Sequence, residues 1–73
     1  MMTPGRVKWF NREKGFGFAE TDMYSHVLVY GNCLENDCQL YDLKESDRVL
    51  LEVRTTFKGP EAVRVRRYVP LSH

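Results

Sequence analysis

The chain has 73 residues, of which 42% are hydrophobic and 29% are charged. This length allows one domain with one small core and no separate catalytic lobe, which excludes most enzymes, and the hydrophobic fraction excludes a disordered tail. The net charge is +1, but residues 53–73 hold five basic and one acidic side chain, whereas residues 35–52 hold two basic and six acidic ones.

Five short segments have the composition and the length of β-strands. Valine occurs eight times and alanine twice, a composition that favours strands over helices. Glycine, proline and polar residues separate the segments, which is typical of turns. The sequence therefore predicts an all-β barrel whose strands are residues 5–11, 15–20, 26–31, 48–55 and 61–69.

The first two predicted strands form a hairpin around a polar connection, residues 11–15. In the second strand, Phe16 and Phe18 alternate with glycine and alanine, so both rings lie on one face. On the first strand, strict alternation would give Trp9 the same direction as Val7. Because we expect Val7 inside the barrel and Trp9 outside it, the pattern predicts a β-bulge between them.

Aliphatic residues at alternating positions of the strands supply the core. In the third strand Val27 and Val29 point inward, which directs Leu28 and Tyr30 to the outer face. Each buried aliphatic side chain contributes roughly 1.5–3 kcal/mol to folding. The predicted core consists of Val7, Ala19, Val27, Val29, Val49, Leu51, Val53, Val63 and Val65.

Residues 32–47 are the least regular part of the sequence, and we expect one helical turn and a long acidic loop there. The tripeptide Lys58-Gly59-Pro60 predicts a loop before the last strand. In that strand Arg64 and Arg66 share one face. Two interpretations of these arginines stay open, a soluble edge strand or a basic extension of a ligand-binding track.

Because aliphatic residues fill the predicted barrel, the aromatic residues on the same strands have no interior to occupy. An exposed aromatic face is costly in water unless something flat and anionic binds it. Bases stack on rings with about 1–3 kcal/mol each, and a basic edge follows the phosphates. The sequence therefore predicts binding of single-stranded nucleic acid. The face comprises Trp9, Phe16, Phe18, Leu28 and Tyr30, and its basic edge comprises Lys8, Lys14, Lys58 and Arg64.

The sequence resembles the cold-shock domain of bacterial cold-shock proteins. Residues 5–18 are similar to the start of that domain, and residues 14–18 match its first ribonucleoprotein motif. Residues 27–30 occupy the place of the second motif, and the similarity extends over residues 5–65. The resemblance implies an OB-fold barrel of five antiparallel strands, with residues 1–73 as one domain. It also implies a single-stranded RNA- or DNA-binding protein of low sequence specificity, with a role as an RNA chaperone or as a regulator of transcription or translation in the cold.

The resemblance also implies which residues bind. Carried over position by position, the binding surface is Lys8, Trp9, Phe10, Asn11, Lys14, Phe16, Phe18, Tyr30 and Lys58, to which we add Leu28 and Phe57 from the residues themselves. The family pattern Val-Phe-Val-His-Phe is replaced by Val-Leu-Val-Tyr-Gly at residues 27–31. Loss of stacking rings there would weaken binding by about 2–6 kcal/mol. Phe57 offers a replacement surface.

An alternative function is a protein-interaction or dimerisation module on the same scaffold. The apolar side chains of Leu28, Tyr30 and Phe57 would then contact another protein or a second copy of the chain. Residues 32–47 are long enough to permit strand exchange into a homodimer.

The longest stretch without an acidic or basic residue, residues 23–34, has twelve residues, whereas a membrane-spanning helix needs roughly 20. The first residues hold no apolar signal-peptide core, so we expect a cytoplasmic protein. Cys33 and Cys38 are interpreted as reduced thiols, because a zinc site would need two more ligands and only His26 and His73 are available. We therefore expect no metal, no cofactor and no catalytic residue.

Overall fold

The computed structural model describes residues 2–34 and 43–68. These residues form five strands and one short 3-10 helix, which confirms the predicted all-β class. The elements are β1 (Thr3–Asn11), β2 (Phe16–Thr21), β3 (Val27–Tyr30), η1 (Gly31–Cys33), β4 (Arg48–Thr56) and β5 (Gly59–Arg67). Each predicted strand overlaps one observed strand, and the predicted end of the last one, Val69, lies outside the described residues.

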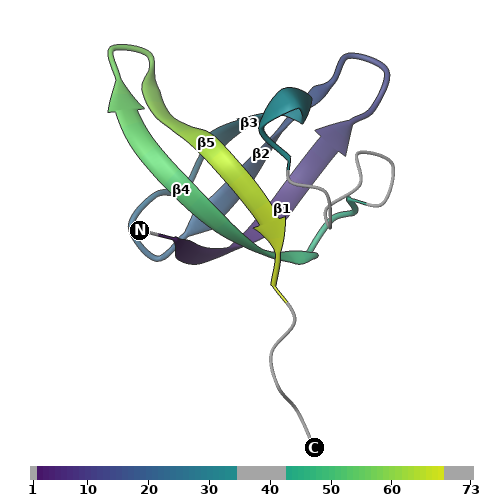
Figure 1. Ribbon diagram of the computed structural model, residues 1–73, viewed down its shortest axis with the longest axis horizontal. Coiled ribbons are helices and arrows are strands. Elements are labelled where there is room, and N and C mark those ends of the chain that lie inside the picture. Colours follow the sequence, from purple (N-terminus) through teal and green to yellow (C-terminus); the bar gives the residue numbers. More distant parts are fainter. Residues whose placement is uncertain (1, 35–42, 69–73) are drawn as a thin grey trace, which may run out of the picture.

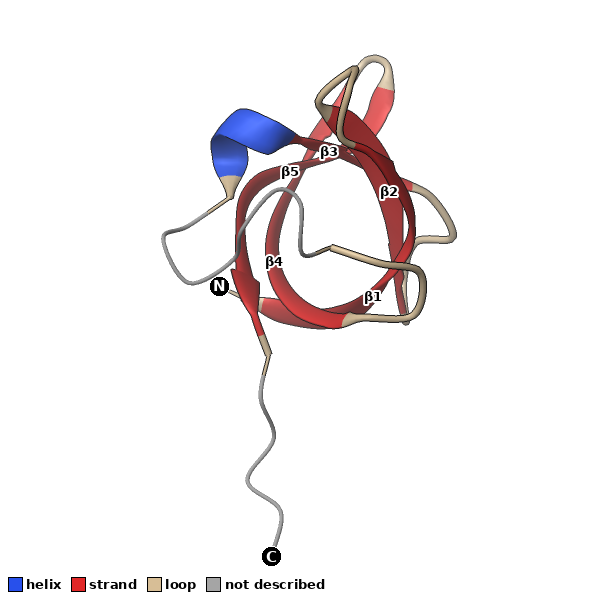
Figure 2. Cartoon of the chain, turned by 90° about the vertical axis from the view of Figure 1, so that its right-hand side faces the viewer, coloured by secondary structure: helices blue, strands red, loops and turns tan. Residues whose placement is uncertain are grey.

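The strands close into a barrel in the order β1-β2-β3-β5-β4, as Figure 1 shows from the side. Neighbouring strands are antiparallel except at the closure, where β3 and β5 run parallel through the pair Leu28 and Glu61. Figure 2 shows the strands surrounding one interior, with the short helix η1 at the outside of the barrel. The outside of the barrel therefore has one surface over β1, β2 and β3 and another over β1, β4 and β5, and the two meet at β1.

Aliphatic side chains fill this interior. Within residues 2–34 and 43–68 the buried core consists of Val7, Ala19, Val27, Val29, Leu43, Val49, Leu51, Ala62 and Val65. The prediction for Val63 was wrong, because the register of β4 and β5 shifts after Glu52, so that Ala62 faces Val53 across the strands. Val63 is the extra residue of this bulge and lies half-buried, and Val53 packs beside the core without being enclosed.

The predicted β-bulge in the first strand is confirmed. Val7 pairs with Ala19 and Trp9 pairs with Phe18, so Lys8 is the extra residue between two registered pairs. The extra residue reverses the alternation of side chains along β1. Val7 is consequently buried at 5% exposure, whereas Trp9 is 45% exposed on the outside.

Two tight hairpins join β1 to β2 and β4 to β5. At the β1–β2 turn the Gly15 amide donates to the Asn11 carbonyl oxygen at 2.8 Å, and Gly15 has a φ of +75°. At the β4–β5 turn, Phe57 and Lys58 are the only residues between the strands. The Thr56 hydroxyl closes that turn by donating to the Gly59 carbonyl oxygen at 2.9 Å. No helix in the described part of the chain is long and apolar enough to span a membrane.

Candidate nucleic-acid interface

The aromatic side chains gather on the outer surface of β1, β2 and β3. Cross-strand register places Phe18 between Trp9 on β1 and Leu28 on β3. The next row along the strands places Phe16 opposite Tyr30. We call Trp9, Phe16, Phe18, Leu28 and Tyr30 the ring face. The strands thus bring together all five side chains that alternation and the predicted bulge place on the outside.

Three rings of this face support one another. The Trp9 ring centroid lies 5.6 Å from that of Phe16 and 5.5 Å from that of Phe18, with interplanar angles of 68° and 60°. The centroids of Phe16 and Phe18 are 6.4 Å apart at 80°. Such edge-to-face pairs contribute about 0.5–1.5 kcal/mol each beyond burial. The contacts leave both phenylalanines half-buried, while Trp9 and Tyr30 stay 45% and 43% exposed.

Close approach of β1 and β2 beneath the rings depends on Gly17. A Cβ atom at this position would lie 2.7 Å from the Phe10 Cα atom and even closer to the Trp9 carbonyl oxygen. Both atoms belong to the backbone, so neither can move without displacing β1. Glycine at residue 17 therefore fixes the spacing between Trp9 and the two phenylalanines.

Phe10 does not join the ring face. It follows Trp9 directly and pairs with Gly17, so its side chain lies on the opposite side of β1 and packs against the core. The role that the resemblance implies for Phe10 in binding stays a prediction. In the structure this ring fills the space that Gly17 leaves open.

Polar side chains border the ring face. The Lys8 ammonium group lies 3.3 Å from the Ser25 carbonyl oxygen and 3.3 Å from His26 Nε2. Lys14 is exposed in the β1–β2 turn, where the Asn11 carboxamide oxygen accepts a hydrogen bond from the Lys14 amide at 2.9 Å. Asn11 therefore orders the turn that carries Lys14.

His26 also belongs to this border, although the sequence indicates it only as a possible zinc ligand. Its ring centroid lies 6.1 Å from that of Phe18 at an interplanar angle of 76°, and the side chain is exposed. The alternation of side chains along β3 could have identified His26 as part of this border. His26 precedes the buried Val27 and so points outward like Leu28.

A groove of about 290 Å³ separates the ring face from the β4–β5 hairpin. One side is formed by Phe18, His26 and Leu28, and the other by the hairpin and the start of β5, with Lys58 and Glu61 among its residues. Phe57 at the hairpin tip does not line the groove and is 96% exposed, so it contacts almost nothing of the protein.

Two basic residues that the sequence analysis placed near the rings have different surroundings. Arg64 Nη1 lies 3.5 Å from Glu52 Oε1 on β4, in the cross-strand pair of β4 and β5. It therefore lies on the outer surface of β4 and β5 and does not edge the ring face. Lys58, in contrast, lines the groove beside Phe18.

Cys33 has the surroundings of a structural thiol. Its Sγ donates a hydrogen bond to the Tyr30 carbonyl oxygen at 2.8 Å. Burial raises the pKa of the Cys33 thiol, although the hydrogen bond to Tyr30 opposes the shift. A raised pKa keeps the thiol protonated at neutral pH and makes it a poor nucleophile. Cys38 and His73 lie outside the described residues, so the reduced state of Cys38 and the absence of a zinc site stay predictions.

Comparison with known proteins identifies the family. The family described as the 'Cold-shock' DNA-binding domain matches residues 3–68. The major cold shock protein CspA of Bacillus cereus is 40% identical over 65 residues, which cover 89% of this chain and 96% of the relative. Cold shock protein CspD of Bacillus subtilis (strain 168) is 41% identical over 64 residues, covering 88% and 96%. The major cold shock protein of Streptococcus pyogenes serotype M1 is 35% identical over 66 residues, covering 90% and 97%. The chain belongs to the cold-shock DNA-binding domain family.

Proposed function

We propose that this protein binds single-stranded RNA or DNA with low sequence specificity by stacking bases on the ring face. The observation that carries the proposal is the position of Trp9, which is 45% exposed on the outside of the barrel and in edge-to-face contact with Phe16 and Phe18. A ring held in this way has lost its rotational freedom before a base arrives, so binding costs little ordering of the protein.

Low specificity follows from the chemistry of the ring face. Aromatic and aliphatic side chains offer flat surfaces that every base can contact. Tyr30 contributes the one hydroxyl group among the five side chains of the face. Discrimination between bases needs hydrogen-bond donors and acceptors at their edges, and the ring face holds few of them.

Lysine side chains supply the electrostatic part. Lys8 lies beside His26 at one border, Lys14 lies in the β1–β2 turn, and Lys58 lies across the groove. If these lysines neutralise roughly two to four phosphates, a plot of the logarithm of the binding constant against the logarithm of the salt concentration has a slope of about −1.4 to −2.8 for a single strand. An affinity that does not change with salt would contradict this part of the proposal.

Binding is weaker than a fully aromatic surface would allow. Leu28 lies on β3 opposite Phe18, where it offers apolar contact but no ring. Each missing stack reduces the binding free energy by about 1–3 kcal/mol. Weak stacking still favours unpaired strands, because any ligand of the open form shifts the equilibrium by mass action. This is the physical basis of the proposed RNA-chaperone role.

Titration with oligothymidine tests the proposal through the fluorescence of Trp9, the only tryptophan in the sequence. We expect quenching at low salt and its loss in the Phe16→Ala/Phe18→Ala variant. Met23→Ala is the matched control, because Met23 is apolar and 80% exposed but belongs to the turn after β2. Absence of quenching at millimolar ligand would refute nucleic-acid binding by this face.

The alternative, a protein-interaction module, has less support. Phe57 is 96% exposed and so packs against neither Leu28 nor Tyr30. Packing contacts therefore do not join the three residues into one cluster. Size-exclusion chromatography of the Phe16→Ala/Phe18→Ala variant distinguishes the functions, because unchanged oligonucleotide binding by this variant would favour a protein partner. Strand exchange through residues 32–47 stays a prediction, since residues 35–42 lie outside the described part.

A further inference from the structure

The second outer surface of the barrel, over β1, β4 and the end of β5, carries an ordered set of basic and aromatic side chains. Arg6 on β1 is directly opposite Arg48 on β4, and the Tyr68 amide donates to the Arg48 carbonyl oxygen at 3.2 Å. The next row consists of Pro4, Leu50 and Arg66. These side chains alternate with buried valines and leucine, so both rows face outward. We call Arg6, Arg48, Arg66 and Tyr68 the arginine face.

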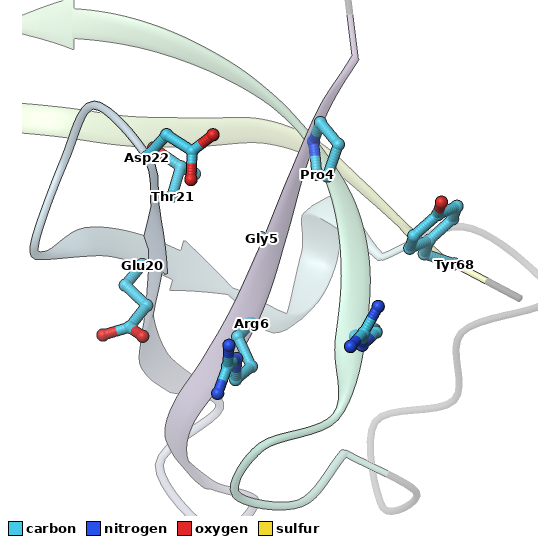
Figure 3. A pocket seen from close by; sticks show the side chains of 8 residues that line it. Pro4, Gly5, Arg6, Glu20, Thr21, Asp22 and Tyr68 are labelled. Atoms are coloured by element: carbon cyan, nitrogen blue, oxygen red, sulfur yellow. The ribbon is translucent and has the colours of Figure 1, made fainter. Parts of the chain in front are cut away.

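A hollow lies on this surface. Its volume is about 270 Å³, and it extends from Glu20 and Asp22 on one side to Arg48 and Tyr68 on the other. Figure 3 shows Arg6 on β1 between Glu20 on β2 and Tyr68 beyond the end of β5. The acidic side of the hollow is thus formed by β2 and its turn, and the basic and aromatic side by β4 and the residue after β5.

The arrangement of charges on this surface is unfavourable for the opposite pair Arg6 and Arg48. Arg6 and Arg48 are like charges directly opposite each other, an arrangement that costs an antiparallel pair stability. Glu20 is the cross-strand neighbour of Arg6 on β2. Considering only residues 2–34 and 43–68, neither Arg6 nor Arg48 makes an ion pair, whereas Arg54 and Arg64 each have a carboxylate at 3.5 Å. An anion between the two guanidinium groups would relieve their repulsion.

The outer side of β1 connects the arginine face to the ring face. Arg6 and Trp9 both point outward on this strand, with Lys8 between them in the bulge. A second hollow, of about 180 Å³, contains Arg6 and Lys8 and is bordered by Glu20 and Glu45. The carboxylates on both borders repel a polyanion, so the favoured path for its phosphates runs between them, over Lys8 and Arg6. A strand that leaves Trp9 in this direction therefore passes Lys8 and then Arg6.

We propose that the arginine face binds the phosphates of a single strand that is already held by the ring face, so that a longer strand continues along β1 onto β4. Guanidinium groups form paired hydrogen bonds with phosphate oxygens, and a tyrosine ring offers a stacking surface for a further base. This inference rests on the proposed function and adds to it a second contact, which only longer ligands reach.

The test compares two lengths of oligothymidine, four and sixteen nucleotides, on the full chain with Trp9 fluorescence. The variant is Arg6→Gln/Arg48→Gln, which removes two positive charges but no ion pair of the described residues. Arg6→Lys/Arg48→Lys keeps both charges. Arg12→Gln/Lys44→Gln removes two exposed charges that lie in neither face, and so controls for a general change in the electrostatic field.

For the wild type we expect the salt slope of the sixteen-nucleotide strand to be steeper by about 1.4, the value for two further phosphates. In Arg6→Gln/Arg48→Gln this difference disappears, so that raising the salt from 50 to 200 mM weakens binding of the longer strand to the wild type about sevenfold more than binding to the variant. Tetranucleotide binding differs less than twofold between the two proteins. The lysine variant keeps most of the difference.

Two outcomes would overturn the inference. Equal loss of affinity for both lengths would mean that the arginines act only through the general field, and unchanged affinity for the longer strand would mean that they contact no nucleic acid. Absence of Trp9 quenching by either length in the wild type would instead refute the proposed function, and the inference with it.

Discussion

Replacement of Gly17 by alanine tests how the ring face is built. The added methyl group would stand 2.7 Å from the Phe10 Cα atom, 2.9 Å from the Phe10 ring and still closer to the Trp9 carbonyl oxygen. Two of these three atoms belong to the β1 backbone, so relief of the clash requires β1 and β2 to move apart. We expect loss of stability and displacement of Trp9 from Phe16 and Phe18.

The magnitude follows from the type of clash. Overpacking a well-packed site costs typically about 1–3 kcal/mol, and backbone atoms that cannot rotate away put Gly17→Ala at about 3 kcal/mol. For a domain of this size each kcal/mol lowers the melting temperature by about 4–8 °C, so we expect a decrease of roughly 12–24 °C. Thermal unfolding followed by circular dichroism measures the decrease. Oligothymidine titration well below the transition measures the accompanying loss of affinity.

Gly15→Asn is the matched control for Gly17→Ala. Gly15 has a φ of +75°, but a Cβ atom there meets nothing within 4 Å. Asparagine tolerates this backbone conformation, so the cost is below about 1 kcal/mol. A melting temperature for Gly17→Ala within 3 °C of the Gly15→Asn value would refute the claim that close approach at Gly17 positions the rings.

Three further predictions concern the core, the ring face and the thiol. Leu51→Ala removes a side chain with 0% exposure and should lower the unfolding free energy in urea by about 2–5 kcal/mol, whereas Leu50→Ala on the outer side should cost less than half as much. Leu28→Phe adds a ring beside Phe18 and should tighten oligothymidine binding by about 1–3 kcal/mol, and an unchanged dissociation constant would mean that residue 28 makes no stacking contact. Because burial raises the pKa of Cys33, the unfolded chain loses its thiol proton first, so stability falls as pH rises above the unfolded pKa. In a Cys38→Ser background, iodoacetamide should label the folded protein more slowly than the urea-unfolded protein at pH 8, and equal rates would contradict the shielding.

Alternation of residues along single strands is enough to place the ring face. Val27 and Val29 are buried while Leu28 and Tyr30 face outward, because a strand with one buried face must alternate. The bulge near Trp9 is also predictable, since Val7 and Trp9 could not both be where their chemistry places them without an extra residue. These inferences depend on neighbours within one strand.

Features that depend on pairing between strands are not predictable in this way. The slip after Glu52 exchanges the positions of Ala62 and Val63 relative to the core, and nothing in the alternation of residues 61–69 indicates it. Phe10 packs against the core opposite Gly17, while the binding role that the resemblance implies for it stays a prediction. The arginine face needs the register of β1 with β4, because Arg6 and Arg48 are 42 positions apart in the sequence.

The bulge at Lys8 connects the stability of the fold with the proposed activity. A strand without the extra residue could bury Val7 or expose Trp9, but not both, because the two residues would share one direction. One residue therefore allows β1 to contribute a core side chain and a ring to opposite faces within three positions. The same residue places the Lys8 ammonium group beside His26, at the point where a strand would leave the rings. Stacking, phosphate contact and core packing thus depend on a single local irregularity. We therefore expect substitutions near the bulge that weaken binding to destabilise the fold as well. Substitutions of exposed side chains such as Arg6 and Arg48 allow the effect on binding to be separated from the effect on folding.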